Sequence, residues 1–144
     1  MKKTISACLT FLLSYIALNS QNVEVIIKGI RSERGQVSIG VYKDEDSFRK
    51  EKAFLNFLFP KETISAGEMR IRLTLEPGVY GLASLDDENN DGKMEYNIIG
   101  IPKEGFGFSN FYLSGFSRPK FEDFKFIVNP GEKKSITIRY RYIL

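Results

Sequence analysis

The chain has 144 residues, 27% of them charged, and a formal net charge of +3. This length suits one domain with one core, and so small a charge does not indicate a nucleic-acid partner. The chain has no histidine and one cysteine, which excludes Ser-His-Asp catalysis, Cys-His catalysis and histidine metal sites.

The N-terminal segment has the pattern of a secretion signal. Two lysines precede an apolar run over residues 5–18, and the small polar residues Asn19 and Ser20 follow it. The run is shorter than the ~20 residues that span a bilayer, so a cleaved signal is favoured over a membrane anchor. We expect residues 1–20 to be removed, and residues 21–144 to form one exported domain without a membrane span.

Removal of this segment would also change the chemistry of the chain. The segment carries two lysines, no acidic residue and Cys8, so the mature net charge falls from +3 to +1. No disulfide, thiol nucleophile or thiolate metal site is then available. The stability of the domain must come from packing, or from packing together with a metal ion.

Six segments of the mature region read as short strands bounded by turn residues. They are 23–29, 35–42, 69–75, 79–85, 121–128 and 135–142. Segments 69–75 and 135–142 alternate apolar and polar residues, so each has one buried face and one wet face. The pattern predicts an all-β fold, an antiparallel β-sandwich of the transthyretin-like or immunoglobulin-like kind with about seven strands.

Two proline-glycine turns predict how these strands connect. Residues 76–78 and 129–132 are short enough to join neighbouring strands as hairpins. Segment 69–75 should therefore pair with 79–85. Its apolar face should lie in a core shared with the last strand: Met69, Ile71 and Leu73 with Ile136 and Ile138.

One short helical crossover is expected between the second and third strands. An aspartate, Asp44 or Asp46, could cap it, and Pro60 would end it. Its apolar residues recur at roughly helical spacing: Phe48, Leu55 and Leu58. We expect the crossover to pack Phe48, Phe54 and Phe57 over one end of the sandwich rather than to bind a partner.

Four motifs carry a family resemblance. Residues 75–82, LEPGVYGL, resemble the L-x-P-G-x-Y-x-L hairpin of transthyretin-like and carboxypeptidase-regulatory-like sandwiches. Residues 87–92 fit D-x-N-x-D-G, and GIPKEGFGFSN at 100–110 and RPKFED at 118–123 follow in order. Together they resemble the domain-of-unknown-function family 2141, small exported proteins of Gram-negative bacteria. The resemblance covers essentially the whole mature chain; it implies a β-sandwich and a periplasmic or secreted location, and no activity.

The acidic loop after segment 79–85 contains a candidate metal site. Asp87, Asn89 and Asp91, followed by Gly92, have the one-three-five oxygen spacing of calcium loops. The backbone carbonyl of Lys93 would add a further oxygen. Calcium suits such an all-oxygen set and is the candidate cofactor; the sequence indicates no other.

The sequence does not decide which residue would complete the ligand shell of this candidate site. The twelfth position, which holds a bidentate glutamate in an EF-hand, is Ile98, and no helices are predicted around the loop. Glu95, Asn97 or Glu104 could complete the shell instead. The alternative is a polar turn in which Asp and Asn side chains bind their own backbone.

The next loop is rich in aromatic residues. Seven of the twelve phenylalanines lie between residues 106 and 126. An apolar or carbohydrate-stacking surface would contain Phe106, Phe108, Asn110, Phe111 and Tyr112. We favour the alternative, in which the rings fold inward and cap the sandwich, because a small domain needs large residues to fill its ends.

Two weaker features suggest alternative functions. A carboxylate pair, Glu95 with Glu104, could serve a glycan hydrolase if the two groups converge in a cleft. If the third and last strands are neighbours, four arginines would form a stripe for anionic glycans or lipids: Arg70, Arg72, Arg139 and Arg141. The favoured function is a non-catalytic binding or structural module of the cell envelope, whose partner is an envelope protein or glycan.

Overall fold

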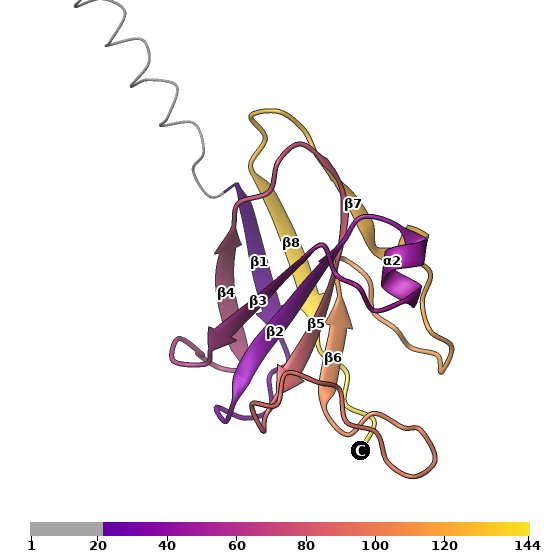
Figure 1. Cartoon of the computed structure of the whole chain (residues 1–144). Helices are drawn as coiled ribbons and strands as arrows, with labels where there is room; N and C mark the ends of the chain where they lie inside the picture. The colour runs from indigo at the N-terminus through magenta and orange to yellow at the C-terminus, as the bar shows by residue number, and fades with distance from the viewer. Residues whose placement is uncertain (1–21) are drawn as a thin grey trace, which may run out of the picture.

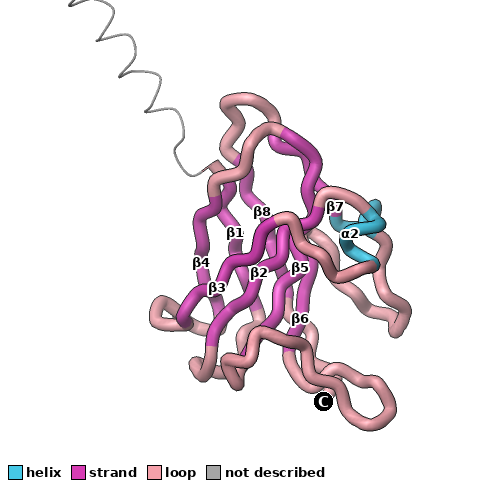
Figure 2. The backbone as a smooth tube through the Cα atoms, viewed as in Figure 1, coloured by secondary structure: helices cyan, strands magenta, loops and turns pink. Residues whose placement is uncertain are grey.

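Residues 22–144 are described by a computed structural model, in which eight strands form two facing sheets (Figures 1 and 2). The strands are β1 (Val23–Lys28), β2 (Gln36–Tyr42), β3 (Leu55–Pro60), β4 (Glu68–Leu73), β5 (Gly78–Asp87), β6 (Gly105–Phe108), β7 (Lys125–Val128) and β8 (Lys134–Arg139). Two short helices, α2 (Glu45–Arg49) and α3 (Phe121–Phe124), lie in the connections. The expected signal, residues 1–20, lies outside the described residues.

The two sheets differ in size. The smaller has the order β4-β1-β8, and the larger has the order β3-β2-β5-β6, with β7 also paired to β5. Every pair is antiparallel except β1 with β8. A parallel pair needs a long crossover, and the six other strands lie between β1 and β8 in the chain. The predicted all-β sandwich is confirmed, with this one parallel pair as a difference.

The main core lies between the sheets. Val23, Val25 and Ile27 of β1 are fully buried, and the residues between them are not, as period-two alternation requires. The core also contains the five residues predicted to share it: Met69, Ile71, Leu73, Ile136 and Ile138. The larger sheet adds Val37, Ile39, Val41 and Leu82. The predicted shared core is therefore confirmed.

A second apolar cluster covers the outer face of the larger sheet. Its buried members are all phenylalanines: Phe48, Phe106, Phe108, Phe121 and Phe124. Phe48 comes from α2, which Asp44 caps by accepting a 2.7 Å hydrogen bond from the Ser47 backbone N–H. Phe48 and Phe124 meet edge to face, with ring centroids 4.8 Å apart. This cluster holds β6 and both helices against the sheet.

The predicted hairpins are wrong. β4 lies in the smaller sheet beside β1, whereas β5 lies in the larger sheet beside β2. The turn at 129–132 likewise leads from β7 in the larger sheet to β8 in the smaller one. A proline-glycine turn reverses the chain but does not decide whether the next strand pairs with the last or faces it across a core. Both arrangements bury one apolar face.

Three element boundaries also differ from the expectation. The helical crossover ends at Arg49, and residues 55–60 form β3, where Leu55, Phe57 and Phe59 share one face with period two. The expected strand 121–128 begins with the helical turn α3. Residues 105–108, expected to be loop, form β6.

In the described part of the chain, no helix is long and apolar enough to cross a membrane.

Candidate functional site

The acidic loop connects β5 to β6 and projects from one end of the larger sheet (Figure 1). β5 ends at Asp87, and the antiparallel register pairs Asp86 with Gly105. One further step along both strands brings Asp87 opposite Glu104. The β2–β5 register places Gln36 opposite Asp87 on the other side. The ends of three strands thus gather polar side chains at one place.

Three carboxylates converge at this place. Oxygens of Asp87, Asp91 and Glu104 all lie within 4.8 Å of one another. Asp87 and Glu104 are buried, whereas Asp91 is exposed. We call this group the acidic triad. Its geometry leaves one side open to solvent, so a cation could enter and keep part of its water shell.

Asp87 is fixed by donors from its own loop. Its carboxylate accepts hydrogen bonds from the backbone N–H groups of Asp91, at 3.0 Å, and Gly92, at 2.9 Å. The Gln36 side-chain amide adds a third donor at 2.6 Å. Gly92 has φ +72°, the left-handed conformation that glycine adopts without strain. The loop therefore curls around the Asp87 carboxylate.

The Glu104 carboxylate accepts fewer hydrogen bonds than that of Asp87. Only 5% of the residue is exposed; one carboxylate oxygen accepts a hydrogen bond from the Glu88 backbone N–H at 3.2 Å. The other oxygen, Oε2, is buried without a hydrogen-bond partner among the described residues. Burial raises the pKa of the Glu104 carboxyl most; the nearby backbone N–H groups of Glu95 and Glu88 lower this pKa in part, and the charges of Asp87 and Asp91 raise it further. A buried oxygen of this kind carries a desolvation penalty that a proton or a cation would relieve.

The other predicted ligands lie around the acidic triad rather than in it. The Asn89 side-chain amide donates to Asp91 at 3.1 Å and to Glu95 at 3.2 Å, and its oxygen accepts from the Asp91 backbone N–H. The Lys93 backbone N–H donates to the Asp91 carboxylate at 2.8 Å. That Asn89, Lys93 and Glu95 supply ligand oxygens stays a prediction.

Glu95 and Glu104, the candidate catalytic pair, lie in different environments. Glu95 lies 3.8 Å from the Lys103 ammonium group and is exposed, whereas Glu104 is buried beside Asp87. The glycan-hydrolase alternative stays a prediction.

The neighbouring residue Asp86 has a different role. It points into the main core, where its carboxylate forms an ion pair with the buried Lys61 and accepts a 2.5 Å hydrogen bond from the Tyr142 hydroxyl. Burial, and then the hydrogen bond to Asp86, raise the pKa of Tyr142. The Lys61 ammonium group also donates to the Ser32 carbonyl at 3.1 Å. In this cluster the negative charge of Asp86 is paired with the positive charge of Lys61, in contrast to the acidic triad.

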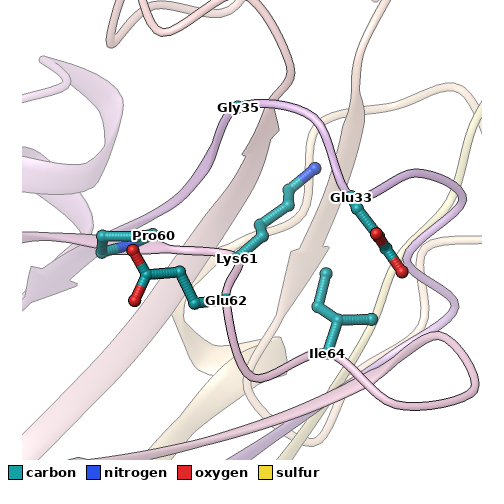
Figure 3. Close-up of a pocket in the computed structure, with 6 residues that line it drawn as sticks. All are labelled: Glu33, Gly35, Pro60, Lys61, Glu62 and Ile64. Carbon is teal, nitrogen blue, oxygen red and sulfur yellow. The ribbon is translucent and has the colours of Figure 1, made fainter.

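The depression next to Lys61 is not a better candidate. It has a volume of about 380 Å³ and lies between the β1–β2 connection and the end of β3 (Figure 3). Its lining residues are Glu33, Gly35, Pro60, Lys61, Glu62 and Ile64. The Lys61 ammonium group is already bound to Asp86, and the described lining residues include no group of carboxylates that could hold a metal ion.

The candidate aromatic surface is divided by the fold. Phe106 and Phe108 are buried in the second cluster, and Phe111 is half-buried against it. The Asn110 side-chain oxygen accepts a hydrogen bond from the Thr137 backbone N–H at 2.9 Å. Tyr112 is exposed. The five residues therefore do not present one continuous ring surface.

The arginine stripe is wrong because its premise fails. β1 lies between β4 and β8, so the third and last expected strands are not neighbours. Glu24 of β1 stands opposite Arg72 and lies 3.8 Å from the Arg70 guanidinium group. Arg141 turns away and donates to the Leu113 and Gly115 carbonyls. The positive face is interrupted, which removes the basis for the anionic-glycan adaptor.

Comparison with known proteins gives the family. A family model described as "Uncharacterized protein conserved in bacteria (DUF2141)" matches residues 25–137. The match runs from β1 into β8 and includes the acidic triad. No curated protein and no solved structure matched the chain. The chain belongs to the bacterial DUF2141 family, as its motifs predicted.

Proposed function

We propose that this protein is an exported, non-catalytic β-sandwich module of the bacterial cell envelope and that its β5–β6 loop binds calcium. The observation that carries the calcium site is the buried Glu104 carboxylate: one of its oxygens, Oε2, has no hydrogen-bond partner among the described residues, and the carboxylate lies beside those of Asp87 and Asp91. Three negative charges in one partly buried place favour a bound cation.

The donor set selects the kind of cation. The acidic triad offers carboxylate oxygens alone, and the chain has no histidine. Zinc prefers nitrogen and sulfur ligands, whereas calcium takes six to eight oxygens in flexible geometry. The exposed side at Asp91 suits a cation that keeps bound water. Calcium is therefore the best fit.

The surrounding loop could complete the shell with small movements. The Asn89 side-chain amide already donates hydrogen bonds to the carboxylates of both Asp91 and Glu95. A rotation of the Asn89 amide would turn its oxygen toward the ion, and the Lys93 carbonyl belongs to the same turn. These are the oxygens that the one-three-five spacing predicts.

Export and the absence of catalysis rest on the sequence. The basic and apolar N-terminal pattern supports export, and the lack of histidine removes the commonest general bases and nucleophile activators. In this proposal the calcium ion stabilises the loop and the strand ends that it joins, and does not activate a water molecule.

Thermal unfolding with calcium and with a chelator tests the calcium site. A ligand that binds only the folded state should stabilise the protein by about 2.7 kcal/mol at a hundredfold excess over Kd. Asp87→Ala should abolish the increase in Tm, whereas Glu62→Gln, a change of an exposed carboxylate outside the acidic triad, should retain it. Unfolding curves that coincide in calcium and chelator would refute the site.

A further inference from the structure

The β5–β6 loop carries exposed apolar residues at its apex. Ile98 is fully exposed at 103%, Ile99 is 73% exposed and Tyr96 is 54% exposed. We call these three residues the apolar tip. Figure 1 shows the loop extending beyond the sheets, away from the main core. Neighbouring isoleucines at the apex of a projecting loop are unusual, because water solvates them poorly.

Hydrogen bonds below the apex keep the apolar tip outside. The Asn97 side-chain oxygen accepts from the backbone N–H groups of Ile99, at 3.0 Å, and Ile101, at 2.9 Å. The Asn97 backbone N–H in turn donates to the Ile101 carbonyl at 2.9 Å. The turn thus uses its polar groups internally and presents its apolar side chains outward.

The apolar tip and the acidic triad share one loop. The Lys103 backbone N–H donates to the Glu95 carbonyl at 2.9 Å, which ties the two arms of the loop together next to Glu104. The exposed Lys93 and Lys103 lie on these arms. Without an ion, the negative charges of the acidic triad offset the positive charges of these two lysines. A divalent cation would add two positive charges at the base of the loop.

This combination suits a lipid surface. A narrow convex apex has no groove for a peptide and too little area for a stable protein interface, whereas a bilayer admits isolated apolar side chains. Tyrosine favours the boundary between headgroups and acyl chains, and lysines attract lipid phosphates. We propose that, with calcium bound, the apolar tip inserts into the headgroup region of a membrane that contains anionic phospholipid. This inference rests on the proposed calcium site.

Vesicle sedimentation of the exported protein, from which residues 1–20 have been removed, tests the inference. Vesicles of phosphatidylcholine and phosphatidylglycerol, at about three to one, are compared with pure phosphatidylcholine, in calcium and in chelator. The wild type should bind the mixed vesicles about tenfold better in calcium than in chelator. Ile98→Asp with Ile99→Asp should lose about tenfold in binding, because burial of even one isoleucine contributes that much.

Ile127→Asp is the matched control, because Ile127 is also exposed but lies on β7. It should bind as the wild type does. All variants begin at the same mature N-terminus, so their differences report the apolar tip. Equal binding by the double variant and the wild type, no binding by either, or binding that does not depend on calcium would overturn the inference.

The Tm of the same samples separates the two proposals. The double variant should keep the calcium-induced increase in Tm, because neither isoleucine belongs to the acidic triad. If the increase is present and vesicle binding fails, the membrane inference alone is wrong. If the wild type shows no increase, the calcium site itself is wrong.

Discussion

Two consecutive residues, Asp86 and Asp87, show how strand alternation separates structural charge from candidate functional charge. Both are fully buried, but they point to opposite faces of β5. Asp86 meets Lys61 and a tyrosine hydroxyl inside the main core. Asp87 meets Glu104 on the outer face, where negative charge is in excess. The negative charge of an aspartate is thus paired with a positive charge on one face of β5, and on the other face it stays available to a ligand.

At the residue scale, Glu104→Gln should have opposite effects on the two forms of the protein. The raised pKa means that the folded state holds the Glu104 proton more tightly than the unfolded state. The metal-free protein keeps full stability from this group below its ordinary pKa of 4.5, and loses stability as pH rises through the raised value. The glutamine variant has no charge to bury.

We therefore expect Glu104→Gln to stabilise the chelated protein at neutral pH by about 1–3 kcal/mol and to weaken calcium binding. Urea unfolding in chelator at acidic and neutral pH measures the first effect, and calorimetric titration with calcium measures the second. A variant that is less stable than the wild type in chelator at neutral pH would show that the Glu104 carboxylate is not under strain.

The ion pair in the main core gives a second prediction at this scale. Lys61→Met should destabilise the protein by about 3–5 kcal/mol, because it leaves Asp86 buried and unpaired. Adding Asp86→Asn should restore much of the loss, since the amide carries no charge and its oxygen still accepts from the Tyr142 hydroxyl. Chemical unfolding of both variants checks this. Equal losses in the single and double variants would contradict the pairing.

At the element scale, β6 is the strand on which the site depends. Its backbone exchanges hydrogen bonds with Arg141, just beyond β8, in addition to pairing with β5. The strand therefore bridges the two sheets on one side. It also places Glu104, immediately before its first residue, against Asp87. A strand of four residues holds this position because its neighbours approach its glycines closely.

Gly107→Ala tests that close approach. A Cβ at Gly107 would lie 2.6 Å from the Ile138 side chain and 2.8 Å from the Arg139 carbonyl oxygen. The Arg139 oxygen is a backbone atom, so it cannot move away as easily as the end of a flexible side chain. We expect a loss of about 1–3 kcal/mol in the free energy of unfolding. Gly115→Ala is the control, because nothing lies within 4 Å of its Cβ position and its φ is not positive. Similar stability of the two variants would argue against the described β6 position.

At the scale of the whole molecule, we expect the N-terminal segment to be cleaved from the described sandwich. The family match begins at residue 25 and β1 begins at Val23, just after the expected cleavage position. Mass spectrometry of the exported protein should therefore find an N-terminus near Gln21. An acylated Cys8 at the mature N-terminus would contradict cleavage there and indicate a lipoprotein.

Much of the fold was predictable because burial follows local pattern. The alternation of Met69, Ile71 and Leu73 identified a strand and its buried face before any partner was known. β6 was missed because its four residues, GFGF, are all buried and half of them are glycine, so no polar residue marks an outer face. Glu104 was named as one of three residues that could close the loop, and sequence spacing could not choose among them.

The sequence by itself determined the β-sandwich class, the core faces, the family and the acidic loop, because these depend on periodicity and on residues close together in the chain. The tertiary structure alone decided which strands pair, that Glu24 interrupts the arginines, and that Glu104 meets Asp87. These contacts join residues far apart in the chain, and their register is set by the packing of both sheets at once. Local patterns do not contain that information.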